Sequence, residues 1–234
     1  MFNEQAFIHR AVEAAQEVGN LMKQEGEISD YEIVIVDDAS TDLTGTIAEG
    51  LARQDPRIRV IHNPVNRKLG GTLKAGFSAA SKDIILYSDA DLPFDMMELR
   101  KAYRIMRNYK ADIVSAYRHD RTGEGPRRAL YSYIYNFMIR TLFGLRVRDV
   151  NFSFKLMRRS VFEHFRLKSE GSFIDAEFLI RAQRLGFKIV QFGTDYYPRT
   201  RGVSTLSSWK VIFNILREML SLRGELKKLA PLPH

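Results

Sequence analysis

The sequence predicts an α/β protein with a mostly parallel central sheet and helices on both faces. Short apolar segments rich in β-branched residues are typical of strands that are covered on both faces. They alternate along the chain with longer segments in which apolar residues recur every three or four positions, as in helices. Such alternation favours a parallel sheet. The 234 residues, 45% of them apolar, are sufficient for one large core.

The elements can be assigned in chain order. Strands are expected at 31–36, 58–62, 83–88, 111–116 and 188–193. Helices are expected at 5–24, 42–54, 69–81 and 95–109, followed after a less regular stretch by an aromatic helix at 127–140 and an amphipathic helix at 207–228. We expect a single domain over 1–206, followed by the C-terminal amphipathic helix and tail over 207–234.

The charge balance limits the kinds of partner. The sequence has 36 basic and 28 acidic side chains, a net charge of +8, which favours partners that carry phosphate. No cysteine is present, so disulfides and thiolate metal sites are excluded. The first residues lack the pattern of a secretory signal, and the longest uncharged run, 129–139, is shorter than the ~20 residues of a membrane-spanning helix. We therefore expect a protein that is soluble or peripheral to a membrane.

Acidic residues follow two of the expected strands. Asp37 and Asp38 end the first strand, and Asp89 and Asp91 come directly after the third. Ligands of open parallel sheets collect at the carboxyl ends of the strands. Residues two apart in an extended chain point to one side, so both carboxylates of the second pair can reach one divalent cation. Helix capping alone could explain either pair, but two such pairs in one sheet favour a metal held against a diphosphate.

The order of four segments carries a family resemblance. FNEQ, VIVDDASTD, NRKLGGTLKAGF and SDADLP resemble the family-2 nucleotide-sugar glycosyltransferases of the GT-A fold, which is Rossmann-like. The later segments are similar to the dolichol-phosphate mannose synthase branch. The resemblance covers essentially the whole chain and implies a glycosyltransferase.

The resemblance also implies a donor site for a UDP- or GDP-sugar. It places the nucleotide near Asn3, Glu4, Asp37, Asp38, Asn66, Lys68, Gly70 and Gly71. Asp89 and Asp91 would bind Mg²⁺ or Mn²⁺, which holds the diphosphate. The stretch 199–207 resembles a further diphosphate element and nominates Arg199, Gly202 and Ser204, although Thr205 stands where the family has lysine and Arg201 could supply that charge. An ordinary turn into a helix is the alternative for the glycine loop.

Basic residues of the second half are candidates for an acceptor phosphate. Arg118 follows a strand, and Arg128 lies four residues before Ser132, so the last two would share a helix face. The arrangement is similar to the element that holds the acceptor phosphate in the lipid-phosphate branch. An arginine fork suits phosphate oxygens, whereas ordinary solvated charges are the alternative.

The acceptor determines the chemistry that is needed. An ionised polyprenyl phosphate needs no strong general base, whereas a hydroxyl acceptor would. Asp175 and Glu177 lie where family members place an acid near the sugar, so Asp175 is a candidate catalytic residue beside Asp89, Asp91 and Arg118. Acids at a helix start are the alternative explanation. Segment 149–160 resembles the acceptor-side strand and nominates Asp149 and Lys155.

Two helices favour a lipid acceptor. Aromatic residues at 131–143 and an apolar stripe at 209–220 flanked by basic residues suit a membrane headgroup interface, although packing against the sheet is the other explanation. We expect inverting transfer to a polyprenyl or dolichyl phosphate by an enzyme that is cytoplasmic and peripheral to the cytoplasmic face of the membrane.

One strand of the resembled fold is not found. Relatives have an apolar strand immediately before the Asn-Glu pair, and here Met1 and Phe2 leave no room for it. Its absence would leave backbone groups unpaired in the middle of a sheet. We expect that the natural chain begins upstream of Met1 or that another segment fills the position.

Other functions remain open at this point. A transferase for a saccharide or protein hydroxyl is the first alternative; a nucleotidyltransferase would have an early glycine-rich loop, which the sequence lacks. A signalling receiver domain would share the acid pattern but needs about half this length. Nucleic-acid binding is not expected, because the basic residues are dispersed and match no recognition motif. The sugar, the donor base and the oligomeric state are not predicted.

Overall fold

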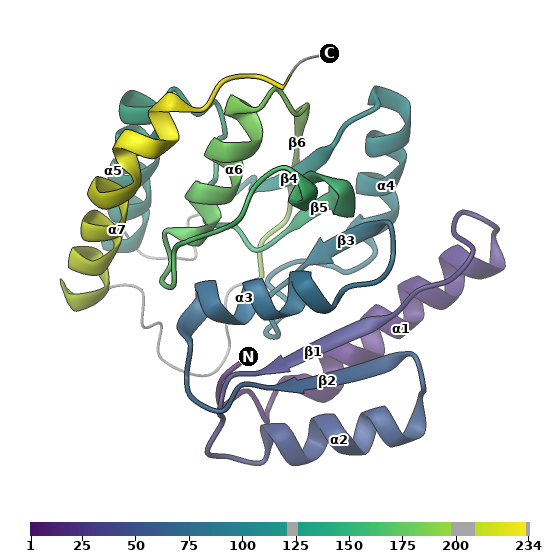
Figure 1. Cartoon of the computed structure of the whole chain (residues 1–234). Coiled ribbons are helices and arrows are strands. Elements are labelled where there is room, and N and C mark those ends of the chain that lie inside the picture. Colours follow the sequence, from purple (N-terminus) through teal and green to yellow (C-terminus); the bar gives the residue numbers. More distant parts are fainter. Residues whose placement is uncertain (121–125, 198–208, 233–234) are drawn as a thin grey trace.

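The computed structural model describes residues 1–120, 126–197 and 209–232 (Figure 1). In chain order the elements are α1 (Ile8–Gln24), β1 (Ile33–Asp37), α2 (Thr44–Gln54), β2 (Ile58–His62), α3 (Lys68–Ala79), β3 (Ile84–Tyr87), α4 (Glu98–Tyr109), β4 (Ile113–Arg118), α5 (Pro126–Phe143), β5 (Lys155–Arg158), a short 3₁₀ helix (Arg159–Glu163), α6 (Ile174–Arg184), β6 (Ile189–Thr194) and α7 (Trp209–Lys228). The α/β class is confirmed.

The strands form two sheets. β1 and β2 pair in parallel, with Ile33 opposite Ile58 and Asp37 opposite His62. The second sheet has the order β3-β5-β4-β6, in which β4 and β6 are parallel and β5 runs antiparallel to both of its neighbours. The alternation of strands and helices did not predict this antiparallel strand, because β5 follows α5 through a long irregular connection rather than a short crossover.

The helices cover both sheets. α2 packs on the β1-β2 sheet, α3 packs on β1, and α4 packs on β4, β5 and β6. α3 passes between the two sheets in the view of Figure 1. α5, α6 and α7 share one core cluster with the second sheet, which includes Ile113, Phe143, Leu179 and Met219. This packing leaves the carboxyl ends of β1 and β3 facing a common space.

A cavity of about 1490 Å³ separates the two sheets. Its walls include Val34 and Ile35 of β1 and Ile85 and Leu86 of β3. At one end, the Met1 amino group donates to the Val36 carbonyl oxygen (2.5 Å) and the Asp38 N–H donates to the Met1 carbonyl oxygen (2.8 Å). This is how one residue of a parallel strand pairs with its neighbour. Among the described residues, no strand continues from there between β1 and β3, where the sequence predicts that one is missing.

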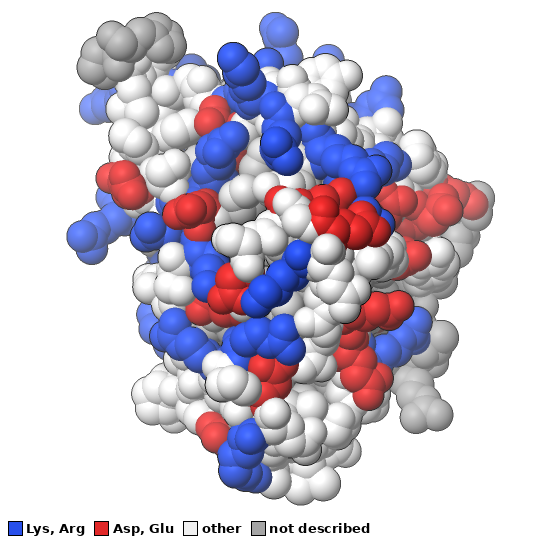
Figure 2. Space-filling view, turned by 90° about the vertical axis from the view of Figure 1, so that its right-hand side faces the viewer, with Lys and Arg blue, Asp and Glu red and all other residues white. Residues whose placement is uncertain are grey.

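The surface that carries α1 and α4 shows mixed charges. Basic and acidic side chains intermingle on this face (Figure 2). Arg100 and Arg104, for example, both form ion pairs with Glu27. The excess of basic residues is therefore not gathered into one patch on this side.

A helix that crosses a bilayer has to be both long and apolar. In the described ranges, none of them is both long enough and apolar enough to span a membrane.

Candidate active site

The first acid pair ends β1, and its two side chains have different surroundings. Asp38 lines the cavity, and its carboxylate accepts hydrogen bonds from the Asn63 side chain (2.7 Å) and the Arg67 N–H (2.8 Å). Asp37 instead contacts Ser40 and His62, at 3.1 Å and 3.0 Å. Neighbouring residues of a strand point to opposite sides, so only one of the two can face the cavity. The expected donor contact of Asp37 is therefore not favoured, whereas Asp38 lies in place for it.

The Asn-Glu pair lies beside Asp38. Asn3 and Glu4 both line the cavity. The Thr41 N–H donates to the Asn3 side chain (2.8 Å), and the Glu4 N–H donates to the Thr44 hydroxyl (2.8 Å). These bonds tie the start of the chain to the loop after β1. Two segments that the sequence separates by almost forty residues thus form one wall of the site.

The second acid pair follows β3. Asp89 and Asp91 line the same cavity. Asp89 is exposed as a residue, yet enough protein surrounds its carboxyl group that desolvation raises its pKa to about 6, helped by the negative charges of Asp91 and Asp175. A hydrogen bond from Ser153 and the positive charge of Lys155 oppose this rise. The pair therefore holds more negative charge than its surroundings balance.

Acids from the two strand ends meet in one cavity, which Asp38, Asp89 and Asp91 all line. Desolvation lowers the pKa of the Met1 amino group, while the charges of Asp38, Asp89, Asp37 and Glu4, in that order of strength, act to raise it. Coulombic effects fall off with distance, which is consistent with these acids lying around the Met1 amino group. The carboxyl ends of β1 and β3 therefore open onto a shared, acid-lined cavity.

The acids of the second pair suit a divalent cation. Among the described residues, no group of three or more His, Asp or Glu side chains is arranged to hold a metal. Two carboxylates beside an open cavity nevertheless offer the hard oxygen ligands that Mg²⁺ and Mn²⁺ prefer, with phosphate oxygens of a ligand completing the shell. A cation would also relieve the repulsion that raises the pKa of Asp89.

The start of α3 supplies a positive charge and a close packing contact. Asn66 and Lys68 line the cavity. Gly70 and Gly71 do not line it: a Cβ on Gly70 would lie 2.4 Å from the Ser169 carbonyl oxygen, and one on Gly71 would lie 2.8 Å from a Glu170 carboxylate oxygen. Both glycines were nominated as nucleotide contacts. The close approach of a neighbouring loop explains Gly70, and that loop together with the Arg67 Cβ, 2.4 Å from the added atom, explains Gly71.

Backbone strain is concentrated at this site. Among the described residues, five non-glycine residues have positive φ, and four of them, Asn3, Ala39, Lys68 and Leu92, lie in or next to the motif segments. Left-handed backbone at such residues is uncommon and persists where the surroundings enforce it, often at functional sites.

The guanidinium of Arg118 is already engaged by an acidic side chain. Its guanidinium forms two hydrogen bonds with Asp149 (2.7 and 2.8 Å) and lies over the rings of Phe152 and Tyr196. Only 7% of the Arg118 side chain and 3% of Asp149 are exposed. The expected catalytic or acceptor-binding role of Arg118 is therefore not supported by its position, because the fork is already occupied by an acid.

Asp175 is also paired and buried. Its carboxylate lies 2.8 Å from the Lys155 ammonium, which also donates to the Phe152 carbonyl oxygen (2.7 Å). Burial raises the pKa of Asp175, and Lys155 opposes this shift. The charges of both residues influence the pKa of Asp89, so an electrostatic effect on Asp89 fits better than the expected catalytic role. The nominated Glu177 is likewise fully buried, against Arg181.

The remaining nominated residues are only partly described. Ser132 is half-buried on α5, and its carbonyl oxygen accepts from the Asn136 amide at 2.8 Å. The side chain of Arg128, together with Arg199, Arg201, Gly202, Ser204 and Thr205, lies outside the described residues.

Some residues of the site were not nominated from the sequence. Asn63 follows β2 as the acids follow β1 and β3, and this position at a strand end is a signal that could have found it. Ser153 has no such signal, because it reaches Asp89 only through the pairing of β5 with β3.

An α/β fold in which two acidic strand ends and a lysine line one cavity is the arrangement expected of transferases that use nucleotide sugars. The sequence model of Glycosyl transferase family 2 matches residues 1–166. The chain belongs to this family and is a glycosyltransferase.

Three relatives illustrate its place in the family. Glycosyltransferase AglD of Haloferax volcanii is 36% identical over 174 residues, which are 72% of this chain but only 28% of that protein. The undecaprenyl-phosphate mannosyltransferase of Micrococcus luteus is 27% identical over 85% of this chain and 86% of its own length. The polyprenol monophosphomannose synthase of Mycolicibacterium smegmatis is 30% identical over 75% and 70%. These similarities agree with the dolichol-phosphate mannose synthase-like branch.

Solved structures support the fold. Glucosyl-3-phosphoglycerate synthase from Mycobacterium tuberculosis, in complex with phosphoglyceric acid, has a TM-score of 0.68 at 20% identity and covers 96% of this chain and 78% of its own. The same enzyme in complex with Mn²⁺ and UDP-glucose has a TM-score of 0.67 at 19% identity and covers 96% and 77%. The expected GT-A fold is confirmed.

Proposed function

We propose that the protein transfers a sugar, with inversion, from a nucleotide-diphosphate sugar to a polyprenyl phosphate. The observation that carries this proposal is the single cavity onto which Asp38, Lys68, Asp89 and Asp91 open. The relatives named as undecaprenyl-phosphate and polyprenol transferases supply the acceptor class.

The donor would lie along the carboxyl ends of β1 and β3. Asn3, Glu4 and Asp38 form the wall that we assign to the base and ribose, and Lys68 is placed to contact the diphosphate. Asp89 and Asp91 would hold Mg²⁺ or Mn²⁺, which neutralises charge on the leaving diphosphate when bound. The solved structure of glucosyl-3-phosphoglycerate synthase, which contains Mn²⁺ and UDP-glucose, is consistent with this assignment.

The acceptor determines the rest of the reaction. A phosphate oxygen attacks the anomeric carbon from the side opposite the diphosphate; the new carbon–oxygen bond forms as the bond to the diphosphate breaks. The phosphate is already ionised at neutral pH, so no side chain has to remove a proton. This agrees with the buried, ion-paired state of Asp175. Ser132 and Arg128 remain the proposed acceptor contacts.

We also propose that α5 and α7 contact the membrane that holds the acceptor, on its cytoplasmic face. Five apolar residues of α5 are exposed, at spacings that place them along one side of the helix: Leu130, Tyr131, Tyr133, Ile134 and Phe137. Phe213 and Leu220 of α7 are more than 60% exposed. Exposed aromatic residues suit a headgroup interface, and exposed Arg140 and Arg223 suit anionic lipids.

Donor binding is tested by calorimetric titration with UDP- and GDP-sugars, with and without Mn²⁺. One of the two donors should bind only with the metal, and Asp91→Ala should remove that binding, whereas Glu163→Gln, an exposed acid of the 3₁₀ helix, should not. Binding that is independent of the metal, or unaffected by Asp91→Ala, would refute the assignment.

The acceptor is tested by transfer of a radiolabelled sugar. Label should enter an extractable polyprenyl phosphate and not a saccharide or peptide hydroxyl. Transfer to the hydroxyl alone would overturn the lipid acceptor. Vesicles with anionic lipid should bind the wild type and bind Tyr133→Ser/Phe137→Ser less, while Tyr109→Ser, an equally exposed tyrosine on α4, binds unchanged.

A further inference from the structure

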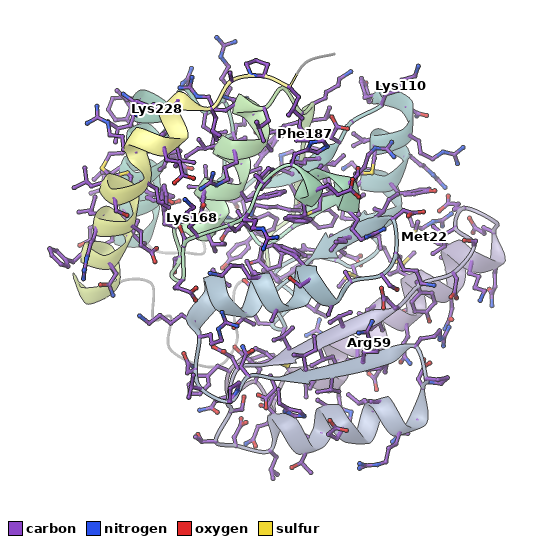
Figure 3. The ribbon with its side chains drawn as sticks, in the orientation of Figure 1. Met22, Arg59, Lys110, Lys168, Phe187 and Lys228 are labelled. Atoms are coloured by element: carbon purple, nitrogen blue, oxygen red, sulfur yellow. The ribbon has the colours of Figure 1, made fainter. Side chains whose placement is uncertain are left out.

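The loop 168–172, which precedes α6 in the chain, contacts both the start of α3 and α7. Figure 3 shows Lys168 in this loop, between α7 and the end of α3 that carries the donor-site residues. On the α3 side, the Gly70 N–H donates to the Glu170 carbonyl oxygen (2.9 Å), and Lys74 forms an ion pair with the Glu170 carboxylate. The loop is therefore bonded directly to the first turn of the helix that bears Lys68.

On the other side, the loop is held by acids. Glu218 of α7 accepts hydrogen bonds from the Glu170 N–H (3.1 Å) and the Gly171 N–H (2.8 Å) through one carboxylate oxygen. Glu225, about two helical turns further along α7, pairs with the Lys168 ammonium at 2.6 Å. Buried Glu177 of α6 accepts from the backbone of Lys168 and Ser169, at 2.9 Å and 2.7 Å. Bonds between a carboxylate and backbone amides are among the strong ones in proteins.

α7 also forms part of the cavity itself. Asn214, Ile215 and Glu218 line it together with Gly171 and Ser172 of the loop, and Lys68 and Asp89 line the same cavity. A Cβ on Gly171 would lie 3.0 Å from the Glu218 carboxylate, so the loop and the helix are in close contact. The C-terminal helix is thus built into the wall of the donor cavity.

We propose that Glu218 is a positioning residue for donor binding, which acts through the loop 168–172 on the start of α3. The inference rests on the proposed function, because it assigns Lys68 and its neighbours to the donor diphosphate. Glu218 fixes the loop, the loop fixes the Gly70 amide, and the first turn of α3 then presents Lys68 to the cavity. Removing the carboxylate frees the loop while Lys68, Asp89 and Asp91 stay in place.

The first test needs no ligand. Hydrogen exchange of the backbone amides at 70–74 should be faster in Glu218→Ala than in the wild type, while exchange in α4 stays unchanged. Glu218→Gln keeps an oxygen acceptor and should restore most of the protection. Lys227→Ala, a change at an exposed residue of the same helix, is the matched control and should behave as the wild type. Unchanged exchange at 70–74 in Glu218→Ala would overturn the proposal.

The second test measures donor affinity by calorimetry with UDP or GDP and Mn²⁺. Loss of two charge-assisted bonds should weaken nucleotide binding by Glu218→Ala roughly tenfold, with most of the affinity kept in Glu218→Gln. Faster exchange at 70–74 with unchanged nucleotide affinity would overturn the positioning role. A wild type that binds neither nucleotide would instead refute the proposed function, and the exchange data would still decide whether Glu218 holds α3.

A double-mutant cycle identifies the route. Lys74→Ala breaks the contact between the loop and α3 from the opposite side. If both residues act through the loop, the loss of nucleotide affinity in Glu218→Ala/Lys74→Ala is clearly smaller than the sum of the single losses. Additive losses would show that Glu218 acts elsewhere and would overturn the proposed route.

Discussion

At the scale of single residues, the pKa of Asp89 depends on the charge of Lys155, which does not line the cavity. Lys155 is 1% exposed and Asp175 is 4% exposed, so the two charges of this pair are almost wholly removed from water. Burying an ion pair costs desolvation energy, and removing one partner strands the other. The pair shapes the electrostatics behind Asp89, because the charge of Lys155 lowers the pKa that Asp91 and Asp175 raise.

Lys155→Met tests this dependence. Stranding the Asp175 carboxylate should lower the free energy of unfolding by about 3–5 kcal/mol, measured by urea denaturation at pH 7. Lys155→Met/Asp175→Leu should regain most of that loss, since no buried charge remains. A single variant as stable as the wild type would show that the pair is not needed for stability.

His62 connects the first acid pair to α2. Its ring nitrogens lie 3.0 Å from an Asp37 oxygen and 2.9 Å from a Glu49 oxygen. Hydrogen bonds with Glu49 and then Asp37 raise the pKa of His62 above its ordinary value of 6.5. A raised pKa in the folded state contributes stability that is fully present below 6.5 and is lost as the pH rises through the raised value.

The pH dependence of His62→Gln follows from this sign. The variant should melt at a lower temperature than the wild type at pH 5.5, and the difference should shrink as the pH rises above 6.5 and through the raised pKa of His62. Thermal melts across this range measure it. A difference that is constant with pH, or that grows toward alkaline pH, would contradict the assigned protonation.

At the scale of elements, α3 shows how packing and binding share one helix. Gly70 and Gly71 allow the loop 168–172 to approach, while Lys68, at the first position of the helix, faces the cavity. The glycine pair predicted a nucleotide loop from the sequence. The segment leads into α3, and its glycines contact residues about one hundred positions away; its contact with a nucleotide stays a prediction.

Gly70→Ala measures the cost of that contact. Because the new Cβ would clash with backbone, we expect a loss of about 1–3 kcal/mol in the free energy of unfolding. Gly224→Ala is the matched control: no atom lies within 4 Å of its Cβ position in α7, so the change should stabilise the helix by roughly 0.5–1 kcal/mol. Equal effects of the two substitutions would mean that the loop can yield.

The elements themselves were largely predictable from the sequence. β1, β2, β3, β4 and β6 overlap the expected strands, because a β-branched apolar run is a local signal. The strand ends that carry Asp38, Asp89 and Asp91 were predictable for the same reason. The direction of β5 and the partners of Arg118, Lys155 and Glu218 were not, since each depends on residues brought together only by the tertiary fold.

At the scale of the whole molecule, the division into two sheets is the dominant feature. Met1 already pairs with β1 as a residue of a parallel strand would, and the cavity beyond it has apolar walls. A strand placed there would join the β1-β2 sheet to β3. The predicted position of the missing strand and the position of this cavity coincide.

A strand supplied upstream of Met1 should therefore stabilise the protein. We expect five or six Val- and Ile-rich residues fused before Met1 to raise the melting temperature, since each buried side chain contributes about 1.5–3 kcal/mol before the cost of ordering it. A Gly- and Ser-rich extension of equal length is the control. Equal melting temperatures for the two fusions would show that the cavity does not accept a strand.

The open space between β1 and β3 also affects how the 234-residue chain behaves in concentrated solution. The facing edges of β1 and β3 have no neighbouring strand within the described part of the chain, and such edges can pair with a strand from another molecule. Purified protein should then self-associate as its concentration rises, and the same fusion that fills the space should keep it monomeric.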